Sequence, residues 1–333
     1  MCGASVETID VPRLRGLARI RWLKLGAMRL PRASREEARA WLASSGLSVD
    51  AREDLLDEDT LSISTGSSAA PFCLALAKAS GGRCATIMTP SVLGTRPFSF
   101  AIVPEHDHPR PALNVLTTLG APNHIHRPDL RAAAEARFPS LPAKVVALLL
   151  GGSDGNYLLD ETWARAVLPR LRAAVEEAGA ALLVTTSRRT GRDVDDAVAS
   201  ILGDAPATRC LVLASREPDD APIPAMLGAA THVLVTEDSV SMVSEAATAG
   251  LEVGLLRVRR RAGPWARLRA MCGGGPTRFD ALFDEMSRRG LLVDLGDARG
   301  LGAFLAPMER RTRATFDEAR RAAEWILDRW REG

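Results

Sequence analysis

The chain has 333 residues, of which 46% are hydrophobic and 25% are charged, and its formal net charge is +2. This length and balance are typical of a soluble protein with two globular domains, and the near-neutral charge argues against a nucleic-acid partner. The five cysteines contain no Cys-x-x-Cys pair, so neither a zinc site nor a disulfide framework is expected. No apolar run reaches the ~20 residues of a membrane span, and the first residues lack the apolar core of a secretory signal, so we expect a cytoplasmic protein.

The first 60 residues carry few structural signals. Val6 to Val11 is compatible with a strand. From Arg13 to Arg32, basic residues alternate with leucines, an isoleucine and a tryptophan, and no acidic residue interrupts them. Such a segment can lie on an anionic membrane surface, although we favour an arginine-rich surface element packed on a sheet. The stretch Ser34 to Ser44 predicts a helix, because Ser34 can act as its N-cap and Glu37 completes a capping box.

A regular alternation of strands and helices begins at Leu61. The sequence predicts strands at Leu61–Thr65, Cys84–Thr89 and Phe100–Val103, and a helix at Ser67–Ser80. This order is typical of a parallel sheet with crossover helices. Small polar residues at the start of the helix can contact a phosphate or an acceptor, but a close strand–helix turn is the alternative that we favour.

A polar run follows the third of these strands. Glu105, His106 and Asp107 stand directly after Pro104. Such groups at the carboxyl end of a sheet can carry out general acid–base catalysis, and we name them as candidate catalytic residues. A metal site is disfavoured, because successive side chains in one loop point apart. The alternative is a solvated loop.

A second series of strands and helices begins at Val145. The buried strand there ends in a glycine-rich loop, in which Gly152 and Ser153 can approach a phosphate through backbone amides. Asp154 in the same loop would repel a diphosphate. The strand Ala181–Val184 is followed by a run of hydroxyl and basic side chains that can cradle an anion, namely Thr186, Ser187, Arg188 and Arg189. An ordinary surface loop is the alternative for this run.

The stretch Thr231–Gly250 gives the clearest signal of a binding site. It predicts a buried strand, a polar corner and a helix from Val240 to Ala249, which Gly250 ends. Asp238 or Ser239 can cap this helix, and its free amides and positive dipole end form a site for a diphosphate. We expect the diphosphate to lie near Glu237, Asp238, Ser239, Ser241 and Met242, with Glu245 one turn further on accepting hydrogen bonds from ribose hydroxyls. The alternative is a capped helix with no ligand.

The remaining elements are a strand and a basic run near residue 257, and a long terminal helix. The arginines from Arg257 to Arg261 can face a phosphate or a membrane, although a solvated loop is the interpretation that we favour. Thr312–Arg331 predicts an amphipathic helix that is long enough to reach from one domain to another.

Three stretches resemble known families. The run from Ser239 to Gly250 resembles the donor-nucleotide motif of GT-B glycosyltransferases, with Glu252 standing where that motif has proline. The stretch TEDSVSMVSEAATAG is more closely similar to bacterial relatives of the plant elongated-mitochondria fission factor. So are the Pro-Glu-His-Asp run with its downstream Asn-Val-x-x-Thr-x-Gly pattern, and the run Thr-Thr-Ser-Arg-Arg-Thr. This resemblance also marks Asn114 and Thr118 as residues of the cleft.

The resemblance implies a GT-B-like α/β fold, in which two Rossmann-like domains with parallel sheets face each other across a cleft. We expect an acceptor-side domain at residues 1–140, which lacks the first strand–loop–helix unit of the family. A donor-side domain is expected at residues 141–308, and a terminal helix at residues 309–333 that crosses back to the first domain.

The resemblance further implies a metal-independent glycosyltransferase that moves a sugar from a nucleoside diphosphate sugar to an envelope acceptor, without a tightly bound cofactor. It would act in the cytoplasm or on the inner membrane face, with His106 or Asp107 as the base. Two alternatives stay open. One is a non-catalytic scaffold that recruits a membrane-remodelling partner, and the other is a nucleotide-sugar epimerase of the same architecture.

Overall fold

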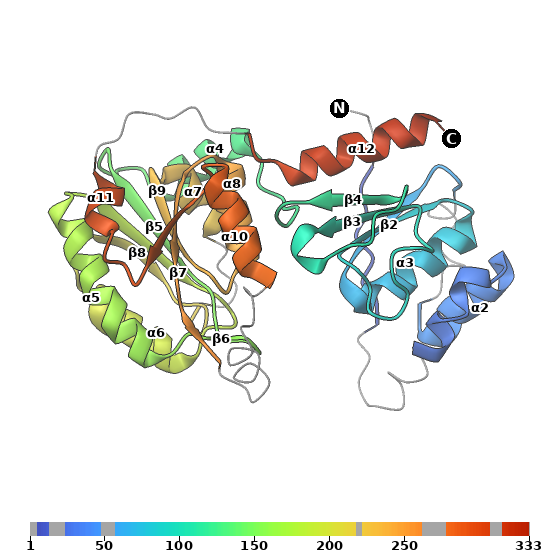
Figure 1. Cartoon of the computed structure of the whole chain (residues 1–333), viewed down its shortest axis with the longest axis horizontal. Helices are drawn as coiled ribbons and strands as arrows, with labels where there is room; N and C mark the ends of the chain where they lie inside the picture. The colour runs from blue at the N-terminus through green and yellow to red at the C-terminus, as the bar shows by residue number, and fades with distance from the viewer. Residues whose placement is uncertain are drawn as a thin grey trace. The chain divides into compact units, whose positions relative to one another are not determined.

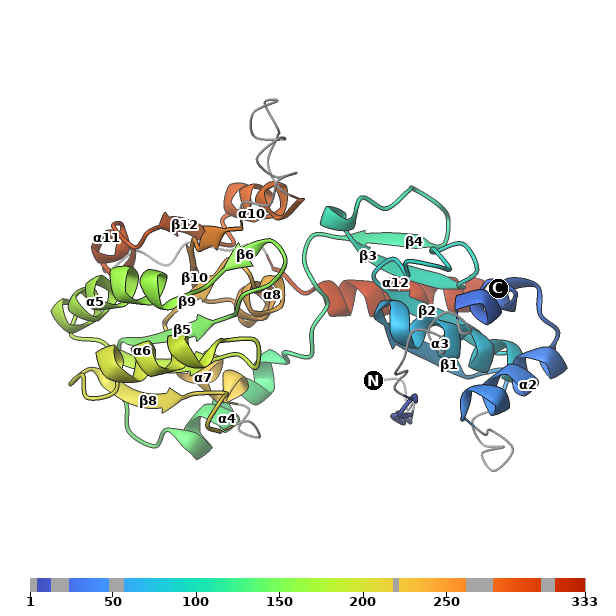
Figure 2. The ribbon, with the colours of Figure 1, turned by 90° about the horizontal axis from the view of Figure 1, so that it is seen from below.

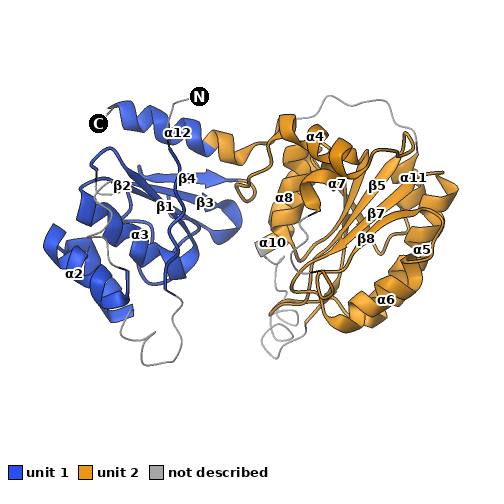
Figure 3. Ribbon diagram, turned by 180° about the vertical axis from the view of Figure 1, so that it is seen from behind, with its two compact units in different colours: residues 1–118, 322–333 blue, residues 119–321 orange. Residues whose placement is uncertain are grey.

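The computed structural model describes residues 5–12, 24–47, 57–217, 222–261, 278–306 and 315–332. These residues form two compact units, shown in different colours in Figure 3. Unit 1 comprises Met1–Thr118 and Ala322–Gly333, and unit 2 comprises Leu119–Arg321. The chain returns from unit 2 to unit 1 within the last helix, α12 (Glu318–Glu332).

Unit 1 contains a four-stranded parallel sheet in the order β1-β2-β3-β4. Its strands are β1 (Leu61–Thr65), β2 (Arg83–Ile87), β3 (Phe100–Pro104) and β4 (Val115–Thr118). Alternate residues of a strand face opposite sides of a sheet. Cys84 therefore packs with α2 (Arg35–Ser45) and α3 (Gly66–Ser80), whereas the adjacent Ala85 packs with Ala322 and Ile326 of α12. Figure 1 shows α3 and α12 on opposite sides of this sheet.

Local sequence signals account for much of unit 1. Helix α2 begins after Ser34 with both hydrogen bonds of the predicted capping box to Glu37, so this prediction is confirmed. The predicted strand at Val6–Val11 is wrong, because residues 5–12 form no strand and Val6 is 93% exposed. Of the basic segment from Arg13 to Arg32, residues 13–23 lie outside the described residues. Residues 24–27 are helical, and the helix η1 (Leu30–Arg32) follows them.

Unit 2 contains a six-stranded parallel sheet in the order β12-β10-β9-β5-β7-β8, which can be followed in Figure 2 from β8 upward to β12. The strands are β5 (Val145–Leu150), β7 (Ala181–Thr186), β8 (Thr208–Val212), β9 (His232–Thr236), β10 (Glu252–Leu256) and β12 (Val293–Gly296). The chain builds the sheet outward from β5 to β8, then returns to β9 and builds in the other direction. This is the doubly wound Rossmann order, and its switch point lies between β5 and β9.

Helices cover both faces of the sheet of unit 2. Leu148 and the other even residues of β5 pack with α5 (Glu161–Glu177), α6 (Arg192–Leu202) and α11 (Leu301–Leu305). Leu149 and the other odd residues pack on the other face with a second group of helices. That group contains α4 (Arg127–Arg137), α7 (Ile223–Ala229), α8 (Val240–Ala249) and α10 (Arg278–Arg288). A short antiparallel ribbon joins β6 (Tyr157–Leu158) to β11 (Arg259–Arg260). The prediction of two Rossmann-like domains with parallel sheets is confirmed.

The division between the units falls between Thr118 and Leu119, ahead of the expected boundary at residue 140. Helix α4 explains this difference, because it packs against α7 of unit 2. The two helices approach so closely that a Cβ atom on Gly228 of α7 would overlap the carbonyl of Leu130 in α4. Only glycine permits this contact.

Candidate functional site

Three polar loops meet at the switch point of unit 2. Residues 151–156 follow β5, residues 187–191 follow β7, and Glu237, Asp238 and Ser239 connect β9 to α8. Since β9, β5 and β7 are adjacent and parallel, all three loops leave the same edge of the sheet. Ligands of doubly wound proteins bind at this edge. The sequence predicted contacts in each of the three loops.

The glycine-rich loop is held by hydrogen bonds within the chain. The amide of Gly151 donates to the Thr236 hydroxyl over 2.8 Å, and the amide of Gly152 donates to Asp238 Oδ2 over 2.6 Å. The carbonyl of Gly151 accepts from the Thr190 hydroxyl, and that of Gly152 accepts from Arg189 Nη1 over 3.3 Å. The predicted phosphate contact of Gly152 therefore requires Asp238 to give up its amide partner.

Close packing explains the two glycines as well. A Cβ atom on Gly151 would overlap the Asp238 carboxylate, and one on Gly152 would overlap the backbone of Arg189. Ser153 is also engaged, because its hydroxyl donates to the Leu159 carbonyl and accepts from the Leu159 amide.

Asp154 has a structural role in the glycine-rich loop. Its carboxylate accepts from the amides of Asn156 and Tyr157 over 2.7 and 2.8 Å and so closes a turn.

Asp238 is the centre of this loop cluster. Its side chain is wholly excluded from solvent, and Oδ2 lies 3.2 Å from Arg189 Nη2 as well as 2.6 Å from the Gly152 amide. Burial raises the pKa of Asp238 above its usual range, and the bonds from Gly152, Thr236 and Arg189 oppose that rise. Arg189, itself half exposed, also donates to the carbonyls of Gly152 and Asp238. Both predicted ligand contacts are thus engaged with each other.

Glu237, the preceding residue, belongs to a different network. Its buried carboxylate accepts from Arg257 Nη1 over 2.8 Å, from the Val258 amide over 2.9 Å and from Arg260 Nη2 over 3.4 Å. Arg257 also pairs with Asp280 and Asp294. Burial lowers the pKa of Arg257, but the hydrogen bonds to Asp294 and Glu237 outweigh burial and leave it raised.

The basic run after β10 makes contacts within the chain, and Arg259 and Arg260 form strand β11 rather than a loop. Arg259, Arg260 and Arg261 nevertheless remain exposed, as the prediction of a solvated segment requires. Arg257 and Arg260 pair with carboxylates as described above, and Arg259 pairs with Asp160 over 2.6 Å. Arg261 donates to the Tyr157 carbonyl. These contacts fasten the β6–β11 ribbon and α10 to the carboxyl end of β9.

The start of α8 is open in the sense that no side chain caps it in the part of the chain that the structure describes, although Ser239 itself is buried. Ser239 is the N-cap residue, as expected, but neither its side chain nor that of Asp238 accepts a hydrogen bond from the first turn. Ser241 is exposed at the first turn, whereas Met242 is buried in the core behind it. An uncapped helix start leaves donors and partial positive charge directed outward. The Met242 side chain lies in the core, so only its backbone amide belongs to these donors.

The loop after β7 carries two exposed arginines, of which Arg189 is already paired with Asp238. Thr186 is buried and its hydroxyl accepts from the Ala214 amide over 2.9 Å, while the Ser187 hydroxyl accepts from the Arg189 amide over 3.2 Å. Arg188 is exposed, and it makes no ion pair with any described residue. Of the four residues predicted in this loop, Arg188 has its side chain available for an anion.

Glu245 is half-buried one turn along α8. Burial raises its pKa, and the nearby charge of His124 opposes that rise. His124 comes from the loop between β4 and α4, which is fixed to α8 by two side-chain contacts. The Ala121 amide donates to the Ser244 hydroxyl over 3.1 Å, and the Asn123 amide group donates to the Thr248 hydroxyl over 2.9 Å. Sequence reasoning missed His124, although its place in the Gly120–Arg127 run next to Asn123 was a usable signal.

The three candidate catalytic residues of unit 1 form the helix η3 (Glu105–Asp107) at the end of β3. Glu105 is exposed, whereas the side chains of His106 and Asp107 are only 7% and 10% exposed. His106 Nε2 lies 3.7 Å from Asp107 Oδ1. Asn114 has a structural role, since its amide group donates to the carbonyls of Thr95 and Phe98 over 3.0 and 2.9 Å. Thr118 is buried at the end of β4.

A family model described as mitochondrial fission ELM1 matches residues 6–330. The chain belongs to the mitochondrial fission ELM1 family. No curated protein matches it.

Solved structures that resemble this ELM1-family chain include two sugar-nucleotide epimerases and a synthase. The UDP-GlcNAc 2-epimerase of Neisseria meningitidis, solved with UDP-GlcNAc bound, is 15% identical, with 91% of this chain and 83% of that chain covered and a TM-score of 0.47. Another UDP-N-acetylglucosamine 2-epimerase is 13% identical over 96% and 80% of the two chains, with a TM-score of 0.48. The trehalose-phosphate synthase of Burkholderia xenovorans is 12% identical over 96% and 79%, with a TM-score of 0.46. At these TM-scores the likeness does not extend to a site or a substrate.

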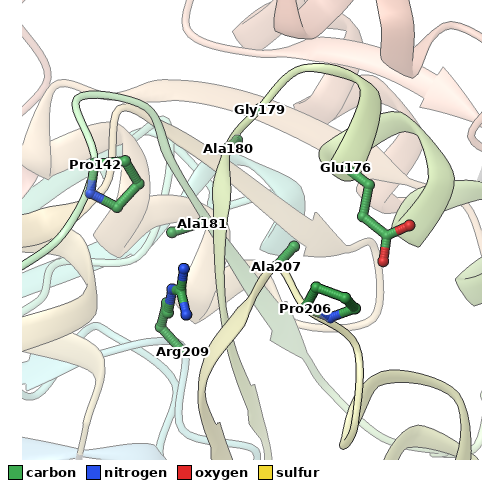
Figure 4. Close-up of a pocket in the computed structure, with 8 residues that line it drawn as sticks. All are labelled: Pro142, Glu176, Gly179, Ala180, Ala181, Pro206, Ala207 and Arg209. Atoms are coloured by element: carbon green, nitrogen blue, oxygen red, sulfur yellow. The ribbon is translucent and has the colours of Figure 1, made fainter.

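A cavity of about 430 Å³ lies at the opposite edge of the sheet of unit 2. Ala181 at the start of β7 and Ala207 just before β8 line it, and Figure 4 shows the charged groups of Glu176 and Arg209 on different sides. This position at the amino ends of the strands separates it from the switch-point loops. In the ranges that the structure describes, no cluster of three metal-ligating side chains is found, and no helix is long and apolar enough to cross a membrane.

Proposed function

We propose that unit 2 of this ELM1-family protein binds the diphosphate and ribose of a nucleotide sugar, and that the protein is a metal-independent glycosyltransferase. The observation that carries the proposal is the open start of α8 at the switch point of a doubly wound sheet, with Arg188 in the adjoining loop. Backbone donors, a helix dipole and a guanidinium are the groups with which proteins bind phosphates when no metal takes part.

The spacing along α8 supports a nucleotide rather than a free phosphate. Glu245 lies one helical turn beyond Ser241, which is about 5.4 Å along the axis. A carboxylate at that distance can accept hydrogen bonds from the two ribose hydroxyls while the diphosphate contacts the helix start. Its partial burial, which raises its pKa, makes such hydrogen bonds valuable, because they stabilise the ionised form.

The acceptor side of the proposal lies in unit 1. Transfer to a hydroxyl requires a base, and His106 next to Asp107 is the pair that we assign to this step. Because only 7% of the His106 side chain is exposed, the acceptor hydroxyl has to approach that small exposed part of η3. An envelope acceptor at the cytoplasmic face of the membrane completes the proposal. The 60% and 61% exposed side chains of Leu25 and Met28 in the basic segment support a membrane contact.

Calorimetric titration with uridine, guanosine and cytidine diphosphate sugars tests the donor site. We expect micromolar binding of one nucleotide class, and at least tenfold weaker binding in Glu245→Ala and Arg188→Ala. Glu176→Ala and Arg209→Ala are matched controls, because they remove the same side chains from the opposite edge of the same unit. Equal loss in the controls, or no binding by the folded protein, would overturn the donor-site assignment.

A non-catalytic scaffold is the second candidate, and the engaged glycine-rich loop favours it. If the Gly151 and Gly152 peptides serve only the fold, unit 2 has fewer groups to offer a nucleotide. The scaffold then binds no nucleotide sugar in the same titration, and its function survives Glu245→Ala. No contact in the described residues favours an epimerase.

A further inference from the structure

The groups around the Asp238 carboxylate resemble a phosphate site more than a structural ion pair. A glycine-loop amide and a guanidinium converge on Oδ2. Gly151 packs directly against the carboxylate, where any other residue would place a Cβ atom in contact with it, and the loop lies at the carboxyl end of β5. Proteins use this combination of a glycine-rich loop, backbone amides and arginine for phosphates. In this protein, the anion in that place is a side chain of the chain itself.

The hydrogen bonding of Asp238 is incomplete. Oδ2 accepts from the Gly152 amide and from Arg189, and the Thr236 hydroxyl also lowers the pKa of Asp238. The buried Oδ1 has no hydrogen-bond partner among the described residues. Glu237 provides a direct comparison in the preceding position. Both of its oxygens are paired, with three donors in total. A buried carboxylate with an unsatisfied oxygen is expensive for the folded state. Glu237 is therefore fixed by its partners, and Asp238 is the carboxylate that can be displaced.

The position of Asp238 allows such a displacement. It lies in the turn between β9 and α8, and its side chain is held by groups from two other loops rather than by its own helix. Burial raises the pKa of Asp238, which agrees with a carboxylate in an unfavourable place. The alternative is that Asp238 only links the three loops to one another.

We infer that Gly152 and Arg189 form a phosphate site that Asp238 fills as an internal anion, and that a phosphate or diphosphate group enters by displacing it. This inference rests on the proposed function in one respect, since the natural entrant would be the diphosphate of the nucleotide sugar. Asp238 then sets the affinity for the donor. It competes with the phosphate for the same amide and the same guanidinium.

Chemical rescue of Asp238→Ala tests this inference without any nucleotide. The variant leaves the Gly152 amide and Arg189 without their acceptor, so its thermal midpoint should fall below that of the wild type. Inorganic phosphate or diphosphate should raise it again with saturation. Diphosphate should bind the variant at least tenfold more tightly than the wild type by calorimetry. The double variant Asp238→Ala/Arg189→Ala should lose most of that binding. The control Asp196→Ala removes an exposed carboxylate from an arginine pair elsewhere in unit 2 and should resemble the wild type.

Two results would contradict the inference. A midpoint that follows ionic strength alone, with sodium chloride as effective as diphosphate, shows that Asp238 is only a link between loops. If Asp238→Ala does not fold, Asp238→Asn replaces it. This variant keeps the shape and removes the charge, and diphosphate binding no tighter than in the wild type would then refute the inference.

The two proposals fail separately. Nucleotide-sugar binding by the wild type without anion rescue of Asp238→Ala supports the donor site and refutes the internal anion. Anion rescue without nucleotide binding by any form of the protein supports the internal anion and refutes the proposed function.

Discussion

Glu237 is predicted to be a structural residue, although it lies next to the candidate site. Its carboxylate has 1% exposure and joins β9 to Arg257, to Arg260 and to the Val258 amide. Loss of one partner of a buried ion pair typically destabilises a protein by about 3–5 kcal/mol. Arg257 keeps Asp280 and Asp294, so the lower end applies, and we expect about 3 kcal/mol for Glu237→Ala.

Glu237→Gln should be milder than Glu237→Ala. The glutamine carbonyl can still accept from the Val258 amide, and such a bond contributes about 1 kcal/mol, so we expect a loss of about 2 kcal/mol. Arg260→Ala is the control. Its side chain is 42% exposed, and exposed ion pairs contribute only about 0–1 kcal/mol.

Hydrogen exchange measured by mass spectrometry on peptides from β9, β10 and α10 is the appropriate assay. A chain with two units need not unfold in one step, so a single unfolding free energy is poorly defined. We expect faster exchange in all three elements and a nucleotide affinity within twofold of the wild type. Unchanged exchange together with lost affinity would refute this reasoning, and would make Glu237 a binding residue.

Three further predictions concern other parts of the chain. Because burial raises the pKa of Glu245 above its ordinary 4.5, the folded state binds the proton more tightly than the unfolded state does, and the wild type loses stability as pH rises through the raised pKa. Glu245→Gln should therefore have a higher thermal midpoint than the wild type at pH 8, and the difference should shrink below about pH 4.5. A thermal midpoint of the wild type that rises relative to that of the variant with increasing pH would contradict this. Asn114→Ala leaves two loop carbonyls without donors and should cost about 1–3 kcal/mol of local stability, seen as faster hydrogen exchange in peptides that contain Thr95 and Phe98. Unchanged exchange there would argue against the structural role. Gly228→Ala should destabilise unit 2 by about 1–3 kcal/mol, because α7 and α4 must move apart to admit the methyl group. Unchanged hydrogen exchange in both helices would show that they move apart without loss of stability.

The sequence predicts the bounds of the helices and strands well where glycine or capping residues mark their ends. The strand at Leu61–Thr65 and the helix at Val240–Ala249 have the predicted bounds. Gly66 follows the strand and Gly250 follows the helix, so a glycine marks the end of each element. The strand predicted at Val6–Val11 is absent, because β-propensity forms a strand only where a partner strand is available.

The candidate site was predictable only as a set of loops. The sequence identified the loops after β5, β7 and β9, but not that Asp238 pairs with the amide of Gly152, which is 86 residues away. That pairing depends on the sheet order, which brings β9 next to β5, and no local pattern contains it. For the same reason, the sequence does not predict the pairing of Glu237 with Arg257 or the position of His124 near Glu245.

Glu237 and Asp238, which follow β9, explain why the sequence predicts more phosphate contacts than the structure leaves available. Glu237 takes up the basic groups on the β10 side, and Asp238 takes up Arg189 and a glycine-loop amide on the β5 side. Most of the predicted phosphate contacts are consequently satisfied within unit 2, and Arg188 and the open start of α8 are what the described residues still offer an anion. These groups alone make a weak diphosphate site, and displacement of Asp238 would make a strong one. In the proposed donor site, the affinity for a diphosphate therefore depends on whether Asp238 leaves its place. Substitution of Asp238 tests this while the network around Glu237 stays intact.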